Sequence, residues 1–482
     1  MGVLAKIEQA VWSWPLLLLI LGCGIFLTVR LRAYPFRRLP QALRLIFEKP
    51  EQDGISPFAA LCTSLSATVG TGNIVGAAAA VVLGGAGALF WMNVSAVLCM
   101  SVKYAECLLA VRFREGKNGG PFVYLRHIPG GKVLSALFAV FGAVAGLLGV
   151  GTFVQVNSVT SGTDDYLAHC APALFCEVTV FGVKHGLLTV LLCAGMAVLA
   201  AVILCGGIER ISRASSVLVP LMAGLYLLLC LWILLANRAS LPAIFRRIFT
   251  EAFCPKAVGG GLLGVMQAGI SRGIFSNEAG LGTAPIAAAA GGSNNAVHQG
   301  LVGMTANLFD TVLVCSLTGL CVLCTGADRL GLLGTAVTMR AFARGLPFAP
   351  TVSQGAVLLC LSLFAFTTVV GWSFYGVRCL GALTHENPLA RKLYLCLYIA
   401  AVFFAPYLHT ETVWTAANIL NGLMAAPNLL GLLLLSGEVT KETFYGTDLS
   451  GRTTHRGGQA AARTVHRRAG RHAGACKAGS WR

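Results

Sequence analysis

The sequence is poor in charged residues, and this shortage is its most informative feature. Only 11% of its 482 residues are Asp, Glu, Lys or Arg, whereas 56% are hydrophobic. A soluble globular domain has about 25% charged residues, so a water-soluble chain of this size would lack the charge needed to cover its surface. The mean hydropathy of +0.75 predicts instead a protein that crosses a membrane many times. The composition excludes a soluble enzyme and a disordered chain.

Acidic residues are scarcer than basic ones, which gives a net charge of +17. Such a charge is typical of nucleic-acid binding, but its distribution argues against that function. Eight Lys and Arg, with no acid, lie in the last 31 residues, and most of the remainder lie in loops between apolar runs. We therefore expect no nucleic-acid partner. The basic tail is interpreted as a solvated segment, and contact with anionic membrane lipids is the alternative. The nine His lie in loops, at the ends of apolar runs or in the tail, so a zinc enzyme is not indicated.

Apolar runs long enough to cross a bilayer, about 20 residues each, occur eleven times. They predict an all-helical polytopic membrane protein. The predicted spans cover residues 11–30, 55–83, 87–112, 133–160, 186–206, 212–236, 257–290, 297–325, 352–377, 392–407 and 412–436.

The second and seventh spans are unusually rich in glycine, and residues 259–282 alone contain eight. Each Gly inside a helix costs about 1 kcal/mol relative to Ala. Either these glycines allow tight helix packing, or the helix breaks within the membrane. The two spans are five apart, and interrupted segments at corresponding positions of two halves are typical of transporters with inverted repeats. We therefore predict broken helices in a five-plus-five core.

This division predicts four regions. Residues 1–53 form an extra N-terminal transmembrane helix and a cytoplasmic loop, residues 54–240 and 241–440 form the two five-helix repeats, and residues 441–482 form a disordered basic tail. Lys and Arg are frequent in the loops after the first, third and ninth spans and in the tail, although the loops after the sixth and eighth run against this trend. The positive-inside rule then predicts a cytoplasmic C-terminus and an N-terminus outside.

Unwound backbone would supply the binding chemistry. In the Gly-rich stretch 66–76, N–H groups at a new helix start can bind a carboxylate, and freed carbonyls can ligate a small cation. Both must be satisfied inside a membrane. In the ninth span, Thr367 and Thr368 offer further oxygen ligands for Na⁺. In the fourth, Gln155 and Asn157 are polar contacts or packing residues.

Three acidic side chains lie within the predicted spans, at Glu106, Glu278 and Asp310. Together with Arg272, Glu278 and Asp310 are candidates for gating charges or for a structural ion pair, because intramembrane charges are expensive. Glu106 lies three residues after Lys103 on one helix face, which indicates a structural or snorkelling pair.

Several of these segments resemble the alanine or glycine:cation symporter family, and the likeness runs through residues 10–440. The family carries an acid where this chain has Asn418, and GGPG where it has Gly84–Gly87. The matching stretches are GTGNIVGAAAAVVLGGAGALFWM (70–92), KYAECLLAVRFR (103–114), GISRGIFSNEAGLGTAP (269–285), HQGLVGM (298–304), FDTVLVCSLTGL (309–320), FAFTTVVGWSFYG (364–376) and NGLMAAPNLL (421–430).

The resemblance implies the fold of neurotransmitter:sodium symporters with one added helix, and symport of alanine, glycine or similar small neutral amino acids with Na⁺ or H⁺ across the bacterial inner membrane. It implies no enzymatic activity. The implied substrate contacts are Thr71, Gly72, Asn73, Gln155, Ser271, Phe275 and Asn277. The implied cation ligands are the Ser66 and Val69 carbonyls with Thr367 and Thr368.

Three alternatives remain at this stage. A channel is disfavoured because the five-helix pairing lies within one chain, and a membrane-embedded enzyme because no His is buried in a span. A degenerate paralogue that acts as a sensor is kept open by Asn418. The sequence carries no signal for the oligomeric state.

Overall fold

The computed structural model describes residues 2–48, 55–116, 118–253, 261–291 and 293–446. Within this described part, nine helical segments are long and apolar enough to cross a membrane, and a tenth span is formed by a pair of helices bent by 57°. A further pair, α15 (Gly261–Asn277) and α16 (Ala284–Ala290), occupies the seventh predicted span. The eleven predicted segments are therefore all present as helices, and the all-helical polytopic class is confirmed.

The N-terminal region begins earlier than the sequence predicted. α1 (Gly2–Val11) precedes α2 (Trp14–Arg30), and the chain turns between them at residues 12 and 13. Pro15 sits in the first turn of α2, where its missing N–H costs no helical hydrogen bond. Two short helices follow, α3 (Tyr34–Arg37) and α4 (Leu39–Leu45).

The first repeat opens with the bent pair. Its elements, in chain order, are α5 (Pro57–Thr68), η1 (Gly72–Gly76), α6 (Ala77–Gly84), α7 (Gly87–Leu98), α8 (Met100–Arg112), α9 (Pro121–Tyr124), η2 (Leu125–His127), α10 (Gly131–Leu148), α11 (Phe153–Cys170), η3 (Pro172–Leu174), the antiparallel hairpin β1 (Glu177–Val180) and β2 (Val183–Gly186), α12 (Leu187–Leu204) and α13 (Gly207–Ala236).

The fourth span differs from the prediction of one run over 133–160. It is interrupted at residues 149–152, between α10 and α11, and continues to Cys170. A side chain on Gly151 would place its Cβ 2.7 Å from the Cβ of Trp372, so glycine permits this close approach. In the sequence, the polar residues after 160 look like a loop. Their partners lie in the β-hairpin, and the sequence pattern did not reveal these contacts.

The short helix η4 (Arg238–Ser240) ends the predicted first repeat. Besides α15 and α16, the predicted second repeat contains α14 (Leu241–Ala252), α17 (Ala296–Asn307), the π-helix η5 (Leu308–Cys315), α18 (Ser316–Cys324), η6 (Ala327–Arg329), α19 (Thr335–Gly345), α20 (Pro350–Thr384), α21 (Pro388–Phe404), η7 (Ala405–Tyr407) and α22 (Thr410–Leu434); the C-terminal helix α23 (Ser436–Tyr445) comes after it. The helix α23 includes the start of the predicted tail, and residues 447–482 lie outside the described part.

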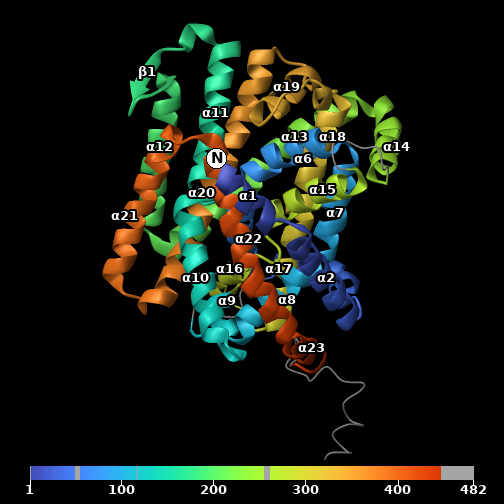
Figure 1. Ribbon diagram of the computed structural model, residues 1–482, viewed down its shortest axis with the longest axis vertical. Coiled ribbons are helices and arrows are strands. Elements are labelled where there is room, and N and C mark those ends of the chain that lie inside the picture. The colour runs from blue at the N-terminus through green and yellow to red at the C-terminus, as the bar shows by residue number, and fades with distance from the viewer. Residues whose placement is uncertain (1, 49–54, 117, 254–260, 292, 447–482) are drawn as a thin grey trace, which may run out of the picture.

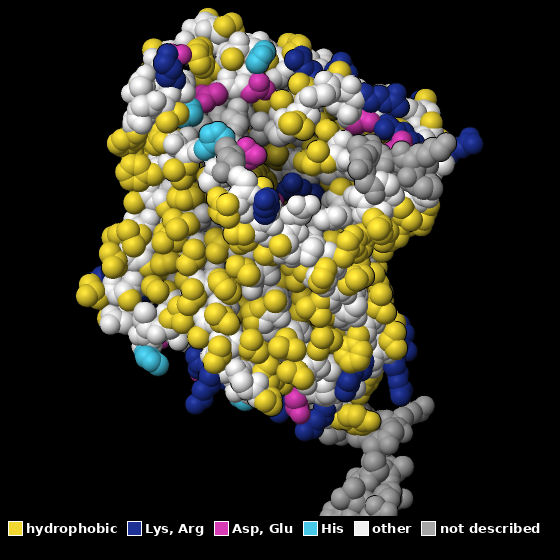
Figure 2. All heavy atoms as spheres, in the orientation of Figure 1, with side chains coloured by type: hydrophobic (Ala, Val, Ile, Leu, Met, Phe, Trp, Pro, Cys, Tyr) yellow, Lys and Arg dark blue, Asp and Glu magenta, His cyan; other side chains and the backbone are white. Residues whose placement is uncertain are grey.

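Burial separates an inner from an outer layer. The span Gly87–Arg112 is 83% buried, whereas Leu187–Leu204 is 33% buried. Hydrophobic side chains cover the middle of the molecule, and charged ones gather towards its two ends (Figure 2), as expected for a protein surrounded by lipid. One end carries α23 and the last turn of α2, joined by a bond from Arg30 to Thr440; the opposite end carries the β-hairpin and α19 (Figure 1). We refer to these as the α23 end and the hairpin end.

Candidate functional site

The first interruption, residues 69–71, lies between α5 and η1. The Gly70 N–H donates to Asn73 Oδ1 at 2.9 Å, and the Thr71 N–H donates to Gln155 Oε1 at 3.1 Å. The backbone N–H of Asn73 donates to the Gly70 carbonyl. In an unbroken helix these three donors would bond the carbonyls four residues earlier. The break therefore releases the carbonyls of Ser66 and Val69 from the helical ladder.

One hydroxyl oxygen of α20, that of Thr368, faces this break, whereas the neighbouring Thr367 hydroxyl contacts Met222 of α13. Thr368 Oγ1 would lie 2.5 Å from a Cβ placed on Gly70, and Ser66 Oγ would lie 2.7 Å from one on Gly371. The hydroxyls of Thr367 and Thr368 both donate to the Phe364 carbonyl, at 2.9 and 3.0 Å. Hydroxyl and carbonyl oxygens are thus gathered beside the break, a donor set that suits a hard cation.

Asn73 connects the first break to η5. Its Nδ2 donates to Asp310 Oδ1 at 2.5 Å and to the Asp310 carbonyl at 3.1 Å. The other carboxylate oxygen of Asp310 accepts from Ser276 at 3.0 Å and from Thr311 at 2.8 Å. The Asn73 side chain is therefore committed to a buried polar network, and it is the Thr71–Gly72 backbone that faces Phe275.

The second interruption, residues 278–283, is held by two side chains of α8. Lys103 Nζ donates to the Asn277 carbonyl at 2.5 Å. Glu106 Oε1 accepts from the N–H groups of Gly280 and Gly282, both at 3.1 Å, and from Asn428 at 2.6 Å. Lys103 and Glu106 are both fully buried, so the snorkelling alternative was wrong. Both side chains are structural, but each contacts the second interruption, and no ion pair within 4 Å joins them in the described part of the chain.

Sequence reasoning gave this pair too little weight. Its signal was the charge itself, because a Lys and a Glu one turn apart inside an apolar run need partners. The partners are backbone groups of a segment more than 170 residues away, which cannot be read from spacing.

Glu278 lies at the second break in the left-handed region, with φ of +54°. Its carboxylate accepts from Thr283 Oγ1 at 2.5 Å and from Trp372 Nε1 at 3.0 Å. The structure brings Glu278 and Asp310 into separate hydrogen-bond networks. In the described part of the chain, neither forms an ion pair with Arg272 within 4 Å.

On the broken helices themselves, two buried polar atoms beside the interruptions lack partners among the described residues, Thr71 Oγ1 and Asn277 Nδ2; the second carboxylate oxygen of Glu106, from α8, also lacks one. Asn277 uses its oxygen to accept from the Ala279 N–H. An unpaired buried polar group costs about 1–3 kcal/mol, so these two atoms are available to a ligand.

The remaining predicted contacts lie on α15. The Phe275 ring would lie 3.5 Å from a Cβ on Gly72, and it stacks against Trp414 at 5.6 Å between ring centroids. Ser271 donates to the Gln267 carbonyl at 2.6 Å. Together with Arg272, Ser271 and Phe275 line a cavity that opens beside α1. Phe275 therefore stands between this cavity and the first break.

Acidic side chains outnumber basic ones at the centre. Lys103 is the one fully buried Lys or Arg of the described residues, whereas Glu106, Glu278 and Asp310 are all at most 1% exposed. Where these carboxyl groups are ionised, their excess would attract cations in the low-dielectric interior.

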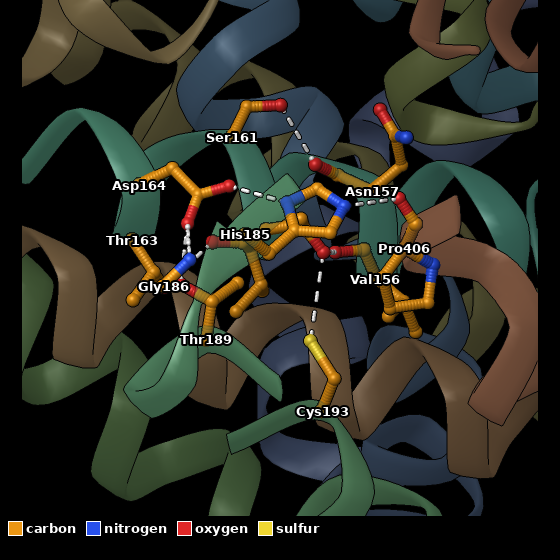
Figure 3. Close-up of polar contacts among 12 residues, drawn as sticks. Val156, Asn157, Ser161, Thr163, Asp164, His185, Gly186, Thr189, Cys193 and Pro406 are labelled. Atoms are coloured by element: carbon orange, nitrogen blue, oxygen red, sulfur yellow. Dashed lines mark hydrogen bonds and ion pairs between the residues drawn. The ribbon is translucent and has the colours of Figure 1, made fainter. Parts of the chain in front are cut away.

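Asn157 belongs to a different network at the hairpin end (Figure 3). It donates to the Leu408 carbonyl at 3.1 Å and accepts at its backbone from Ser161. Nearby, Asp164 accepts from His185, at 2.7 Å, and from Thr189, at 2.6 Å. This network fastens the hairpin to α11 and η7, and it does not reach the breaks.

Two broken helices at corresponding positions of two five-helix halves, with polar groups facing the breaks, define a secondary transporter. The fold agrees with that of the solved structure of MhsT in complex with L-phenylalanine, with a TM-score of 0.56 and 16% identity over 84% of this chain and 94% of that one. The fold is thus that of the neurotransmitter:sodium symporters.

The chain belongs to the sodium:alanine symporter family, whose model matches residues 1–450. It is 40% identical to the sodium/alanine symporter AgcS of Methanococcus maripaludis, over 91% of this chain and 95% of that protein. It is 43% identical to an uncharacterized transporter of Haemophilus influenzae, over 92% of this chain and 95% of that protein. The protein is therefore a membrane transporter and not an enzyme.

Proposed function

We propose that the protein carries alanine, glycine or a similar small neutral amino acid together with Na⁺ across the bacterial inner membrane. The observation that carries this proposal is the pair of unpaired buried atoms, Thr71 Oγ1 and Asn277 Nδ2, one at each break. Other buried polar atoms of the described residues also lack a partner, but these two belong to residues that flank the interruptions. A polar solute bound between the two breaks would satisfy both.

The substrate carboxylate would lie at the backbone of Thr71, Gly72 and Asn73, where a helix begins and its dipole favours an anion. Gln155, which already accepts from the Thr71 N–H, would contribute its amide to the same region. Phe275 and Asn277 would close the site from α15, whereas Ser271 lines the cavity on the other side of Phe275 and would not contact a substrate bound there. Because the Phe275 ring comes so near to Gly72, the space favours a short side chain.

The coupling cation would bind the released carbonyls of Ser66 and Val69 and the hydroxyls of Thr367 and Thr368. These are neutral oxygen ligands, and unwound carbonyls of this kind hold Na⁺ in transporters with broken helices. The carbonyl of Phe364 joins them, because both hydroxyls already converge on it.

The transport cycle would depend on this shared site. Binding of the cation would stabilise the state that faces outside and accepts substrate, and the rocking of one helix group against the other would then expose the site inside. Moving one charge through about 100 mV supplies about 2.3 kcal/mol. We place the N-terminus outside and the α23 end, with the basic tail, in the cytoplasm, where it meets anionic lipid headgroups.

Uptake by the purified protein in proteoliposomes tests this function. Labelled alanine should accumulate when an inward Na⁺ gradient is imposed, and an equal K⁺ gradient should serve as the control. Equal uptake under both gradients would reject Na⁺ coupling. A second set of vesicles with labelled glycine ranks the two substrates.

A proton-coupled carrier is the second candidate, and the buried carboxylates favour it. Glu106, Glu278 and Asp310 are all enclosed at the breaks, and buried acids carry protons in many transporters. Accumulation driven by an inward H⁺ gradient in the absence of Na⁺ would support this version over Na⁺ coupling.

A further inference from the structure

The loops after the sixth and eighth spans, which run against the positive-inside rule, meet at the hairpin end. Arg247 of α14 joins them, because its guanidinium pairs with Glu251 of the same helix at 2.7 Å and with Asp328 of η6 at 2.8 Å. Residues 238–252 and 327–345 contain six Arg and only two acids, Glu251 and Asp328. Since Arg247 already pairs with both acids, the surface that these segments form is strongly basic.

The other five Arg of these segments are all exposed, and we call them the arginine surface. In the described part of the chain, no hydrogen bond or ion pair reaches the guanidinium groups of Arg238, Arg246 and Arg340. Such groups are free to bind an anion from outside the chain. The members of the arginine surface are Arg238, Arg246, Arg329, Arg340 and Arg344.

The helix α14 presents three different faces in turn. Successive residues of a helix lie about 100° apart around its axis. Ile244 begins a buried face, Phe245 begins an exposed aromatic face, and Arg246 lies on an exposed polar face. An apolar face beside a basic one is the pattern of a helix that lies in the surface of a membrane. The aromatic face consists of Phe245, Phe249 and, directly after the helix, Phe253, each about half exposed.

The position of α14 is fixed by its contacts with α7 and the turn before it. Glu251 accepts from the Ala86 N–H at 2.7 Å, and Trp91 Nε1 donates to the Ala252 carbonyl at 2.9 Å. The Phe249 ring lies 5.6 Å from that of Phe90. None of these contacts uses an exposed Arg, so the arginine surface can be changed without releasing the helix.

The end of α13 indicates the depth of this surface in a membrane. Trp232 is 53% exposed and lies six residues before Arg238, a rise of about 9 Å along a helix. Because exposed Trp is enriched where the acyl chains meet the headgroups, this rise places Arg238 among the phosphates. Figure 1 shows α14 at the edge of the molecule, and Figure 2 shows basic side chains gathered along the same edge above a hydrophobic band.

A cavity of about 410 Å³ lies between the loop after η6 and α19. Arg340 and Arg344, one helical turn apart, line it together with Leu330 and Leu332. Its volume falls within the roughly 300–1,000 Å³ of common ligand pockets. A guanidinium group binds a phosphate through two parallel hydrogen bonds, and the leucines suit the apolar part of a lipid beside it.

We propose that the arginine surface and α14 bind anionic phospholipid at the hairpin end. The arginines bind the phosphates, with Arg340 and Arg344 enclosing one of them in the cavity, while the aromatic face of α14 rests on the acyl chains. This binding requires neither the substrate nor the coupling ion. It gives the two loops that run against the positive-inside rule a function other than that of orienting the chain.

Thermal unfolding of the purified full-length protein in a neutral detergent tests this binding. Dioleoyl phosphatidylglycerol should raise the melting temperature, because a ligand of the folded state stabilises it. Dioleoyl phosphatidylcholine, with the same acyl chains and no net charge, should require a higher concentration. Arg238→Gln combined with Arg246→Gln should raise the phosphatidylglycerol concentration of half-maximal effect by about 10- to 30-fold, since each cation near an anionic surface contributes roughly fivefold.

Two further variants separate charge from apolar contact. Lys132→Gln combined with Arg213→Gln removes two exposed cations at the α23 end, near the starts of α10 and α13, and should leave the concentration of half-maximal effect unchanged. Phe245→Gln should weaken the effect of both lipids alike, because they carry the same chains, whereas the hairpin-end Arg pair should weaken that of phosphatidylglycerol alone.

Four outcomes would overturn the lipid site and leave the proposed transport function untouched. They are equal effects of the two lipids, and equal losses in the hairpin-end Arg pair and in the α23-end pair. Stabilisation by glycerol 3-phosphate at the concentrations that the lipid requires would assign the arginines to a soluble anion. A dimer that is seen by light scattering without lipid and is lost in Phe245→Gln would assign the aromatic face to a second copy of the chain.

Discussion

Asn73 and Asp310, 237 residues apart, are joined by a hydrogen bond of 2.5 Å between Nδ2 and Oδ1. Asn73 belongs to the first broken helix, and Asp310 belongs to the π-helix of the second repeat. The same carboxylate also binds Ser276, next to the second break. This contact therefore joins both interruptions to one buried acid. A substitution of either residue should therefore alter the hydrogen bonds at both interruptions.

Asn73→Ala should abolish alanine uptake while the protein still inserts into the membrane. The change leaves the Gly70 N–H and two acceptors of Asp310 without their partner, and each lost bond to a charged group is worth about 1.5–3 kcal/mol. Uptake in proteoliposomes is the measurement. Asn157→Ala, which removes an amide at the hairpin end, is the control and should transport normally. Normal uptake by Asn73→Ala would reject the site.

Gly70→Ala should stop transport for steric reasons. Its Cβ would lie 2.5 Å from Thr368 Oγ1 and 3.0 Å from Gln155 Oε1, both too close for a carbon. Gly76→Ala is the matched control, because nothing lies within 4 Å of the Cβ that it adds. We expect uptake to fall at least about tenfold in the first variant, corresponding to 1.4 kcal/mol or more. Equal activity of the two variants would contradict this geometry.

Thr368→Val should raise the Na⁺ concentration that gives half-maximal uptake, by about tenfold for a lost ligand worth 1.4 kcal/mol. Valine keeps the branched shape and removes only the hydroxyl that faces Gly70. Ser362→Ala is the control on the same helix, since Ser362, within the described part of the chain, bonds only to the Leu358 carbonyl one turn earlier. If Thr368→Val changes the alanine dependence but leaves the Na⁺ dependence alone, the hydroxyl is no cation ligand.

Glu106→Ala should destabilise the protein by several kcal/mol, because three donors lose their acceptor at about 1–3 kcal/mol each. Thermal unfolding in detergent measures the loss. Glu442→Ala removes the carboxylate of an ion pair with Arg112, whose side chain is 46% exposed, and such surface pairs are worth about 0–1 kcal/mol. The two variants should differ clearly in melting temperature, and similar values would mean that Glu106 does not hold the second break.

The two broken helices were predictable because their signal is local. Glycines inside an apolar run mark a helix that is weak at that place, whatever surrounds it. The interruption at residues 149–152 was missed, although it also contains glycine, because an apolar run on one side and polar residues on the other read as the end of a span. Asp164 has its partners in the hairpin and at the start of α12, and Asn157 has its partner at Leu408, just after η7. No sequence spacing connects these segments.

The candidate residues also fall into those that the sequence could place and those whose roles depend on partners far away in the chain. Thr71, Gly72 and Phe275 could be placed at the breaks from sequence, and the structure brings them together. The roles of Lys103 and Glu106 could not, since each depends on a backbone group of a distant segment. Asn73 and Asp310 were singled out separately, and only the fold shows that they are bonded to each other.

The sequence by itself determined the membrane class and the position of both broken helices, because these follow from hydrophobicity and backbone freedom along short stretches of chain. The tertiary structure alone decided which buried charges meet. A carboxylate within the membrane needs donors, and the fold brings these donors from segments that are far apart in the chain. That pairing placed Glu106 and Asp310 in separate networks and left Arg272 facing the cavity beside α1.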